Sequence, residues 1–150
     1  MRVNRRTLTI EWGDCDPAGI VFYPRYFAMF DASTAALFAA ALAITKREIL
    51  KRYGIIGFPM VDTHAKFYIP SNFGDTVMIE STVRRFGRSS FEIDHRLLRD
   101  NALAVECHEK RVWAERNPDT PNGIRGVEIP VQVREALLQQ SAETGEYYGL

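Results

Sequence analysis

The chain has 150 residues, with 19 Lys and Arg balanced by 19 Asp and Glu, so its formal net charge is zero. At this length a single domain over residues 1–150 is expected, with a core large enough to fold without metals or disulfides. The lack of a basic excess argues against a general nucleic-acid binder, which must neutralise phosphates. Two cysteines, Cys15 and Cys107, are too few for a disulfide framework, and their spacing fits no zinc site.

The sequence carries no clear targeting or membrane signal. The basic stretch 1–6 is not followed by the apolar run of a signal peptide. The most apolar stretch, residues 23–44, contains Arg25 and Asp31, which suits a buried helix better than a membrane span. We therefore expect a cytoplasmic protein with no membrane partner.

The first predicted element is a strand over residues 6–12. Polar and apolar side chains alternate there, which is expected to place Leu8, Ile10 and Trp12 on one face. The glycines and proline of residues 13–19 then interrupt regular structure.

Two helices are predicted next. The first runs from Pro24 to residue 42, because proline is tolerated at a first helical position and the many alanines favour a helix. Apolar residues surround nearly its whole circumference, so it is expected to be buried on most sides. A shorter helix over residues 46–53 should end at Gly54, a natural closing residue.

Beyond residue 60 the apolar pattern takes the period of strands. The alternation is clearest where Phe91, Ile93, His95 and Leu97 share one face. Strands are predicted over residues 60–68, 75–86, 90–98 and 103–113. A short extended piece, a helix and a loosely held tail are expected over residues 127–130, 131–141 and 144–150. This order predicts an α+β fold, in which an antiparallel sheet wraps around a central helix.

The predicted strands carry more apolar positions than one helix is expected to cover. These positions are Val77, Ile79, Phe91, Val105 and Val112. Exposed apolar patches usually indicate a partner, so we expect the surplus to be buried by self-association.

The segment from residue 13 to residue 26 holds the best candidates for chemistry. Asp14 and Asp16 are two carboxylates in one short loop, which runs into the N-terminus of the long helix. Backbone amides near Phe22, Tyr23 and Arg25 would face a developing negative charge there, reinforced by the helix dipole. A carboxylate beside such amides suits acyl transfer. From the residues alone, an acid that merely caps a turn is an equally good interpretation.

A family resemblance favours the catalytic interpretation. Residues 11–24, Glu-Trp-Gly-Asp-Cys-Asp-Pro-Ala-Gly-Ile-Val-Phe-Tyr-Pro, resemble the signature of the 4-hydroxybenzoyl-CoA thioesterase family. The similarity is dense over residues 11–31 and continues more weakly at 57–61 and 88–91. It implies the hot-dog fold, in which a sheet wraps a long central helix, for a single domain.

The resemblance also implies roles for particular residues. Asp16 takes the position of the nucleophile or general base, and Tyr23 takes the position whose backbone N–H polarises the thioester carbonyl. Active sites of this family lie between two subunits, which implies at least a homodimer, with a homotetramer as the usual form. No metal or organic cofactor is implied, since coenzyme A is part of the substrate.

Basic residues cluster around the turn between two predicted strands, at Arg84, Arg85 and Arg88, followed by Ser89 and Ser90. Arginine forks and serine hydroxyls are suited to the phosphates of coenzyme A. The alternative is an ordinary solvated turn. The resemblance places part of the coenzyme A contacts at residues 88–90 and favours binding.

Asp31 lies about two turns into the buried helix, where a carboxylate needs a partner. It is a candidate to accept a hydrogen bond from a hydroxyl of the acyl group. A local pair with Arg25, or a structural hydrogen bond to a neighbouring strand, explains it equally well.

Several aromatic residues are candidates to line an acyl slot, namely Phe22, Tyr23, Tyr26 and Phe58. Of the three strand histidines, only His64 lies close to the acyl pocket by the family pattern. The leading hypothesis is therefore a thioesterase acting on an aromatic, 4-hydroxybenzoyl-like acyl-CoA. The alternatives are a broad or short-chain aliphatic acyl-CoA thioesterase and a non-catalytic acyl-CoA-binding protein.

Overall fold

The computed structural model describes residues 1–139, and its centre is the helix α1 (Pro24–Leu42). Pro24 occupies the first turn, as predicted, and the helix ends where Ala43 adopts a left-handed conformation (φ 57°). The second helix, α2 (Lys46–Tyr53), follows after a short break and also has its predicted bounds. Gly54 closes α2 with φ 65°, a conformation that favours glycine.

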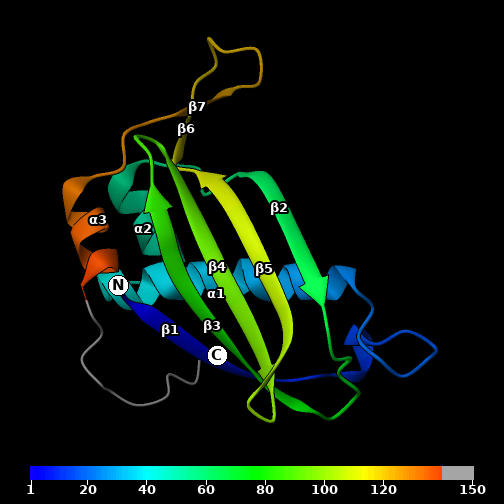
Figure 1. Ribbon diagram of the computed structural model, residues 1–150. Helices are drawn as coiled ribbons and strands as arrows, with labels where there is room; N and C mark the ends of the chain where they lie inside the picture. The colour runs from blue at the N-terminus through cyan, green and yellow to red at the C-terminus, as the bar shows by residue number, and fades with distance from the viewer. Residues whose placement is uncertain (140–150) are drawn as a thin grey trace.

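One antiparallel sheet of five strands lies against α1 in the order β1-β3-β4-β5-β2 (Figure 1). Its strands are β1 (Val3–Thr9), β2 (Met60–Phe67), β3 (Thr76–Phe86), β4 (Ser90–Arg99) and β5 (Ala102–Val112). The helix crosses one face of the sheet, as the α+β prediction requires. Strands β1 and β2 form the two edges, because each pairs with a single neighbour.

The inner face of the sheet is mostly apolar and is covered within the chain. Phe91, Ile93 and Leu97 of β4 are fully buried, which confirms the predicted alternation. Val77, Ile79 and Val105 are also buried, so the expectation that a partner must cover these strand positions is wrong. The reason is that Val77, Ile79 and Val105 pack with Tyr26 and Phe30 of α1 in one core cluster. Helices α2 and α3 (Val131–Leu138) join a second cluster, around Phe91 and Ile93 of β4.

The first strand differs from its prediction. It begins at Val3 and ends at Thr9, and Trp12 lies in a 3-10 turn, 74% exposed, with its ring edge-on to Phe73. Ile10, in contrast, is fully buried. The chain leaves the sheet after Ile10, so the alternation of residues 6–12 does not place Trp12 on the same face.

A second small sheet was not predicted. Strands β6 (Ala114–Arg116) and β7 (Ile124–Gly126) form a hairpin that projects beyond the main sheet (Figure 1). Residues 127–130, predicted as extended, form no strand. Helix α3 begins at Val131 as predicted and ends at Leu138. The predicted end of that helix and the tail 144–150 lie outside the described residues.

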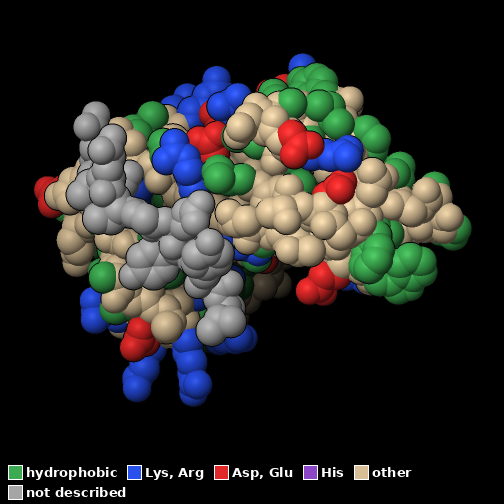
Figure 2. Space-filling model, turned by 90° about the horizontal axis from the view of Figure 1, so that it is seen from below, with side chains coloured by type: hydrophobic (Ala, Val, Ile, Leu, Met, Phe, Trp, Pro, Cys, Tyr) green, Lys and Arg blue, Asp and Glu red, His purple; other side chains and the backbone are tan. Residues whose placement is uncertain are grey.

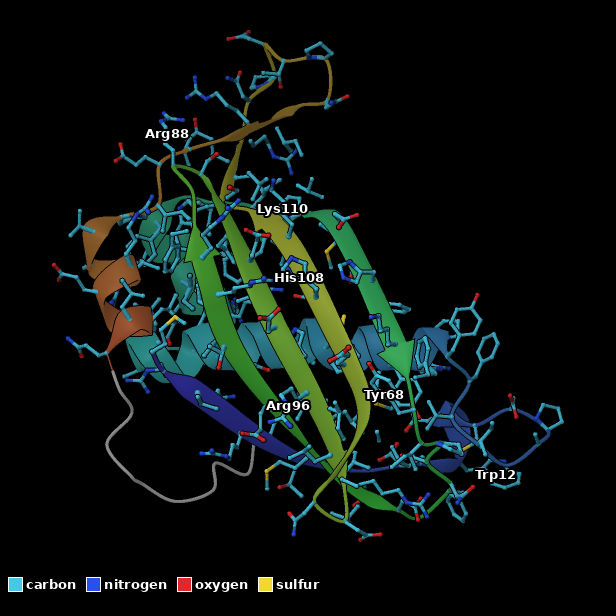
Figure 3. All side chains as sticks on the ribbon, viewed as in Figure 1. Trp12, Tyr68, Arg88, Arg96, His108 and Lys110 are labelled. Carbon is cyan, nitrogen blue, oxygen red and sulfur yellow. The ribbon has the colours of Figure 1, made fainter. Side chains whose placement is uncertain are left out.

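The outer face of the sheet is charged. Oppositely charged side chains face each other across neighbouring strands, as in the pairs Arg5–Glu80 (3.3 Å) and Arg85–Glu92 (2.8 Å). Arg96, His108 and Lys110 point from this face in Figure 3. Within residues 1–139, no single helix is long and apolar enough to span a membrane.

Candidate active site

The loop before α1 is folded back on itself by its own backbone. The Asp16 N–H donates to the Ile20 carbonyl (3.0 Å), and the Gly19 N–H donates to the Asp16 carbonyl (2.9 Å). Gly19 has φ 80°, which a side chain would strain. The Val21 N–H donates to the Ser71 carbonyl (3.0 Å) and ties the loop to the segment after β2. Backbone hydrogen bonds therefore fix the path of the loop.

The two acids of this loop have different partners. Asp14 takes part in hydrogen bonds within the loop. Its side-chain Oδ2 accepts from the Glu11 N–H (2.9 Å), and its backbone carbonyl accepts from the Phe22 N–H (2.8 Å). Asp16 is half-buried, and its Oδ1 accepts from the Ala18 N–H (2.8 Å). Its Oδ2 accepts no hydrogen bond from any described residue. Asp16 thus offers a free carboxylate oxygen held in a fixed orientation.

The start of α1 offers one free backbone donor. The Arg25 N–H donates to the Phe22 carbonyl (2.8 Å), the Tyr26 N–H donates to the Tyr23 carbonyl (3.1 Å), and Pro24 has no N–H. Among residues 1–139, nothing accepts a hydrogen bond from the Tyr23 N–H. The positive end of the helix dipole therefore acts at this amide, which is suited to a developing oxyanion.

Cys15 lies between the two acids and is poorly suited to be a nucleophile. Its desolvation raises the pKa of the thiol, and the charges of Asp14 and Asp16 raise it further. The reactive thiolate is therefore disfavoured at neutral pH.

Three of the four predicted aromatic residues lie together. The ring centroids of Phe22 and Tyr23 are 5.7 Å apart. The ring centroid of Phe67 lies 6.5 Å from that of Tyr23 and 5.7 Å from that of Tyr26. Phe67 was not among the predicted residues, although its position at the end of an edge strand, 48% exposed, marks it. Figure 2 shows hydrophobic side chains gathered at the end of the molecule where this loop projects.

Phe58 lies apart from this aromatic group. Its ring is stacked on Trp113 (5.6 Å) and packs against Phe38 (4.7 Å) in the core near α2. The prediction that its side chain joins the slot is not supported by this placement. Its backbone is nevertheless close to a candidate residue, because the Phe58 carbonyl accepts a hydrogen bond from Arg111 Nη1 (3.1 Å).

Asp31 points out of α1 and pairs with the sheet. Its Oδ1 lies 2.9 Å from Nη2 of Arg111 on β5, and its side chain is 55% exposed. The alternative of a local pair with Arg25 does not occur, whereas the contact to a neighbouring strand does. No described residue donates a hydrogen bond to Oδ2 of Asp31, so this oxygen is open to solvent or substrate.

Arg111 belongs to a buried polar cluster that was not predicted. Its Nε and Nη2 donate to the two carboxylate oxygens of Glu109 (2.8 and 3.0 Å), and both residues are at most 4% exposed. Burial alone raises the pKa of Glu109, but hydrogen bonds from His95 and Arg111 and their charges lower it to about 2. The alternation along β5 could have indicated this cluster, because it places Glu109 and Arg111 on the inner face with Val105 and Cys107.

Three further side chains complete this cluster. Thr34 Oγ1 donates to Glu109 Oε2 (2.6 Å), and His95 Nε2 lies 3.3 Å from the same oxygen. Ser81 Oγ lies 2.7 Å from His95 Nδ1. The resulting chain of serine, histidine and glutamate resembles a hydrolytic triad in composition. Its members are at most 1% exposed, however, so no substrate reaches them.

The basic residues of the β3–β4 turn separate into two groups. Arg85 pairs with Glu92 (2.8 Å), and Arg84 lies 4.0 Å from Asp94, both across the outer face of the sheet. The side chain of Arg88 has no hydrogen-bond or ion-pair partner among residues 1–139. Figure 3 shows Arg88 at the end of the sheet beside the β6–β7 hairpin, far from Trp12.

Ser89 and Ser90 lie in the same turn. The Ser89 carbonyl accepts from the Trp113 N–H (2.7 Å), and the Ser90 carbonyl accepts from the Gly87 N–H (2.7 Å). Gly126 of the hairpin packs closely on Ser89, since an added Cβ would lie 3.0 Å from Ser89 Oγ. The turn is therefore rigid at its base, with Arg88 free at its tip.

His64 lies on the outer face of the sheet, away from α1. Its ring is 5.3 Å from that of His108, which contacts Asp94 (2.8 Å) and Glu92 (3.1 Å). The inner-face groups described above lie on the other side of the same strands. No set of three or more His, Cys, Asp or Glu within the described residues is placed to hold a metal ion.

Comparison with known proteins identifies the family. The model of the thioesterase-like superfamily matches residues 10–137, which include the loop, α1 and every strand of the main sheet except β1. The chain belongs to the thioesterase-like superfamily. The predicted family and class of enzyme, a thioester hydrolase, are thereby confirmed.

A superfamily member from Pseudomonas sp. (strain CBS-3), 4-hydroxybenzoyl-CoA thioesterase, is 32% identical over 126 residues, which is 81% of this chain and 87% of that protein. Its solved structure superposes with a TM-score of 0.83 at 30% identity, covering 91% of this chain and 99% of that one. A gentisyl-coenzyme A thioesterase superposes with a TM-score of 0.77 at 30% identity, covering 89% and 99% of the two chains. The predicted hot-dog fold is confirmed by these structures.

Proposed function

We propose that this member of the thioesterase-like superfamily is an acyl-CoA thioesterase for an aromatic, hydroxylated acyl group, with Asp16 as its nucleophile or general base. One observation carries the proposal. Asp16, a carboxylate with a free oxygen, lies in the loop that runs into α1, and Tyr23, at the N-cap of that helix, has a free backbone N–H. Acyl transfer requires both an attacking group and an oxyanion donor.

The chemistry follows from these two groups. The Tyr23 N–H donates to the thioester carbonyl oxygen, and the helix dipole stabilises the negative charge that develops on it. Asp16 either attacks the carbonyl carbon or removes a proton from an attacking water. In the first route the C–S bond breaks, coenzyme A leaves as a thiolate, and water then hydrolyses the mixed anhydride. In the second route Asp16 takes a proton from water, the water oxygen bonds to the carbonyl carbon, and the C–S bond breaks to release the acid and coenzyme A.

Three observations support an aromatic, hydroxylated acyl group. Phe22, Tyr23 and Phe67 offer partly exposed rings beside the loop. Asp31 keeps one carboxylate oxygen free to accept a hydrogen bond from a hydroxyl. The named relatives are thioesterases for 4-hydroxybenzoyl-CoA and gentisyl-coenzyme A, and one solved structure is of an Asp→Asn variant of a 4-hydroxybenzoyl-CoA thioesterase in complex with 4-hydroxybenzoyl-CoA.

For the phosphates of coenzyme A, Arg88 is the basic candidate whose side chain has no partner among residues 1–139, and Ser89 and Ser90 follow it in the same turn. Arg84 and Arg85 already have carboxylate partners on the outer face, so we assign them a smaller role. No cofactor is needed for the proposed reaction.

We also propose that the enzyme is at least a homodimer, with β2 at the contact. The outer edge of β2 has no partner among the described strands, and apolar side chains on and next to it are exposed. They are Val61 (57%), Phe67 (48%) and Tyr68 (53%). A second copy would cover them, as such patches usually require. The homotetramer implied by the family resemblance is compatible with this contact.

Hydrolysis of 4-hydroxybenzoyl-CoA by Asp16→Asn, followed by free thiol release, tests the proposal. Asn keeps the side-chain shape and the hydrogen bond to the Ala18 N–H but loses the negative charge, so kcat should fall about 100-fold or more. Asp14→Asn is the matched control and should lose much less, because Asp14 is used in the loop backbone. Full activity of both variants, or loss in Asp14→Asn alone, contradicts the assignment. A panel with benzoyl-CoA and straight-chain acyl-CoAs tests the acyl preference.

A further inference from the structure

We propose that Arg111, anchored by Glu109, is the positioning residue that presents Asp31 to the hydroxyl of the acyl group and so sets the substrate preference. This inference rests on the proposed function. It adds a group that does not touch the substrate but determines whether Asp31 is fixed in one orientation.

The guanidinium of Arg111 is held on every side but one. Two of its nitrogens donate to Glu109, and a third contact is the Phe58 carbonyl (3.1 Å). The remaining direction leads to Asp31 Oδ1 at 2.9 Å. Because an arginine fork is planar and each nitrogen is occupied, the contact to Asp31 has one available geometry.

Glu109 is itself fixed from the opposite side. Thr34 reaches it from α1 and His95 from β4, and Ser81 of β3 supports His95. The stacked ring of Phe30, with its centroid 5.0 Å from that of His95, prevents the imidazole from turning. The chain of contacts therefore fixes Arg111 relative to the helix that carries Asp31.

Stability does not account for such a cluster. A buried ion pair contributes little net stability compared with apolar side chains of the same volume, because desolvation opposes the attraction. Here the pair lies under the same helix that carries the free Tyr23 N–H, and its one solvent-facing partner is Asp31. A role in holding the Asp31 carboxylate in one orientation explains why Glu109 and Arg111 are buried there.

The contact with Arg111 also gives the two carboxylate oxygens of Asp31 different roles. Oδ1 is occupied by Arg111, which leaves Oδ2 as the acceptor for a phenolic hydroxyl. A site that hydrogen-bonds a substrate hydroxyl discriminates strongly against the analogue that lacks it. A carboxylate free to rotate into water would lose part of this discrimination.

The test is the ratio of kcat/KM for 4-hydroxybenzoyl-CoA to that for benzoyl-CoA. Arg111→Lys keeps the charge but cannot contact Glu109, Phe58 and Asp31 together, so the ratio should fall about 10-fold or more while kcat/KM for benzoyl-CoA changes little. In an Asp31→Asn background, Arg111→Lys should leave the ratio unchanged. Lys110→Gln, one residue away on the outer face, is the matched control and should behave like the wild type.

Two further variants keep the test decisive. Glu109→Gln with Arg111→Gln leaves no unpaired buried charge and should lower the ratio in the same way. Asp31→Ala changes an exposed side chain and should lower it without affecting folding. Equal losses on both substrates in the Arg111 variants, or an unchanged ratio in Asp31→Ala, overturn the inference. A wild type that hydrolyses neither thioester instead contradicts the proposed function.

Discussion

Strand β5 carries charged side chains on both of its faces, and the two sets are built differently. On the outer face, Glu106, His108 and Lys110 lie opposite oppositely charged residues of β4 and are only partly buried. On the inner face, Glu109 and Arg111 are buried and each hydrogen-bonds several groups. Exposed pairs contribute little because water competes with them, whereas a buried charge without its partner is expensive.

The charged side chains on the two faces of β5 therefore differ in how strongly the fold depends on them. The outer charges form separate pairs on the outer face of the sheet, so replacing one of them should cost about 1 kcal/mol or less. The inner charges depend on each other and on α1 and β4, so they form one unit. The predictions below compare members of the two sets, beginning with the largest effect.

Removal of one inner charge should be the most damaging change. Glu109→Ala leaves the Arg111 guanidinium buried without its main partner, so the free energy of unfolding should fall by about 3–5 kcal/mol. Urea denaturation measures the loss. Glu106→Ala is the matched control on the outer face of the same strand and should cost about 1 kcal/mol or less. Similar losses in the two variants would remove the distinction between the faces.

The free energy of unfolding at low pH should show the contribution of the Glu109 charge. The pKa of Glu109 is lowered from 4.5 to about 2 in the folded chain. A carboxylate with a depressed folded pKa stabilises the fold above its unfolded pKa, and this contribution is lost as the pH falls through the folded value. The loss is about 3 kcal/mol between pH 5 and pH 2. In Glu109→Gln this part of the pH dependence should be absent. Parallel stability curves for the wild type and the variant would contradict it.

Replacement of both inner charges should be milder than replacement of one. Glu109→Leu with Arg111→Met removes the whole ion pair and leaves apolar volume, so the unfolding free energy should recover to within about 2 kcal/mol of the wild type. The same urea experiment compares the double variant with Glu109→Ala. A double variant less stable than the single one would show that the other members of the cluster require the charges.

The sequence predicts the local parts of this molecule well. Pro24 and the alanines that follow determine α1, and the alternation around Phe91 and Ile93 determines β4, because both patterns depend on near neighbours. The loop with Asp14 and Asp16 is also recognisable, since its glycines and proline force it out of regular structure.

Long-range contacts are what the sequence did not predict. Arg111 reaches Asp31 across the interface between β5 and α1, and a strand pattern alone does not tell which helix turn it meets. Alternation predicts a strand as far as Trp12, because the pattern continues beyond Ile10, where the chain leaves the sheet. The β6–β7 hairpin was missed because its strands have three residues each, too few to establish a period.

The smallest expected effect concerns the outer face and its sensitivity to salt. Lys110 lies opposite Glu92 and Asp62 in the strand register, within a row of alternating charges. Lys110→Gln should lower the unfolding free energy by about 0.5 kcal/mol or less at low salt, and the difference should vanish near 1 M NaCl, where exposed charges are screened. The loss in Glu109→Ala should persist at that salt concentration, because buried groups are screened much less. Denaturation at both salt concentrations measures the two variants together. If salt also rescued Glu109→Ala, the inner pair would be accessible to ions, and the contrast between the two faces of β5 would fail.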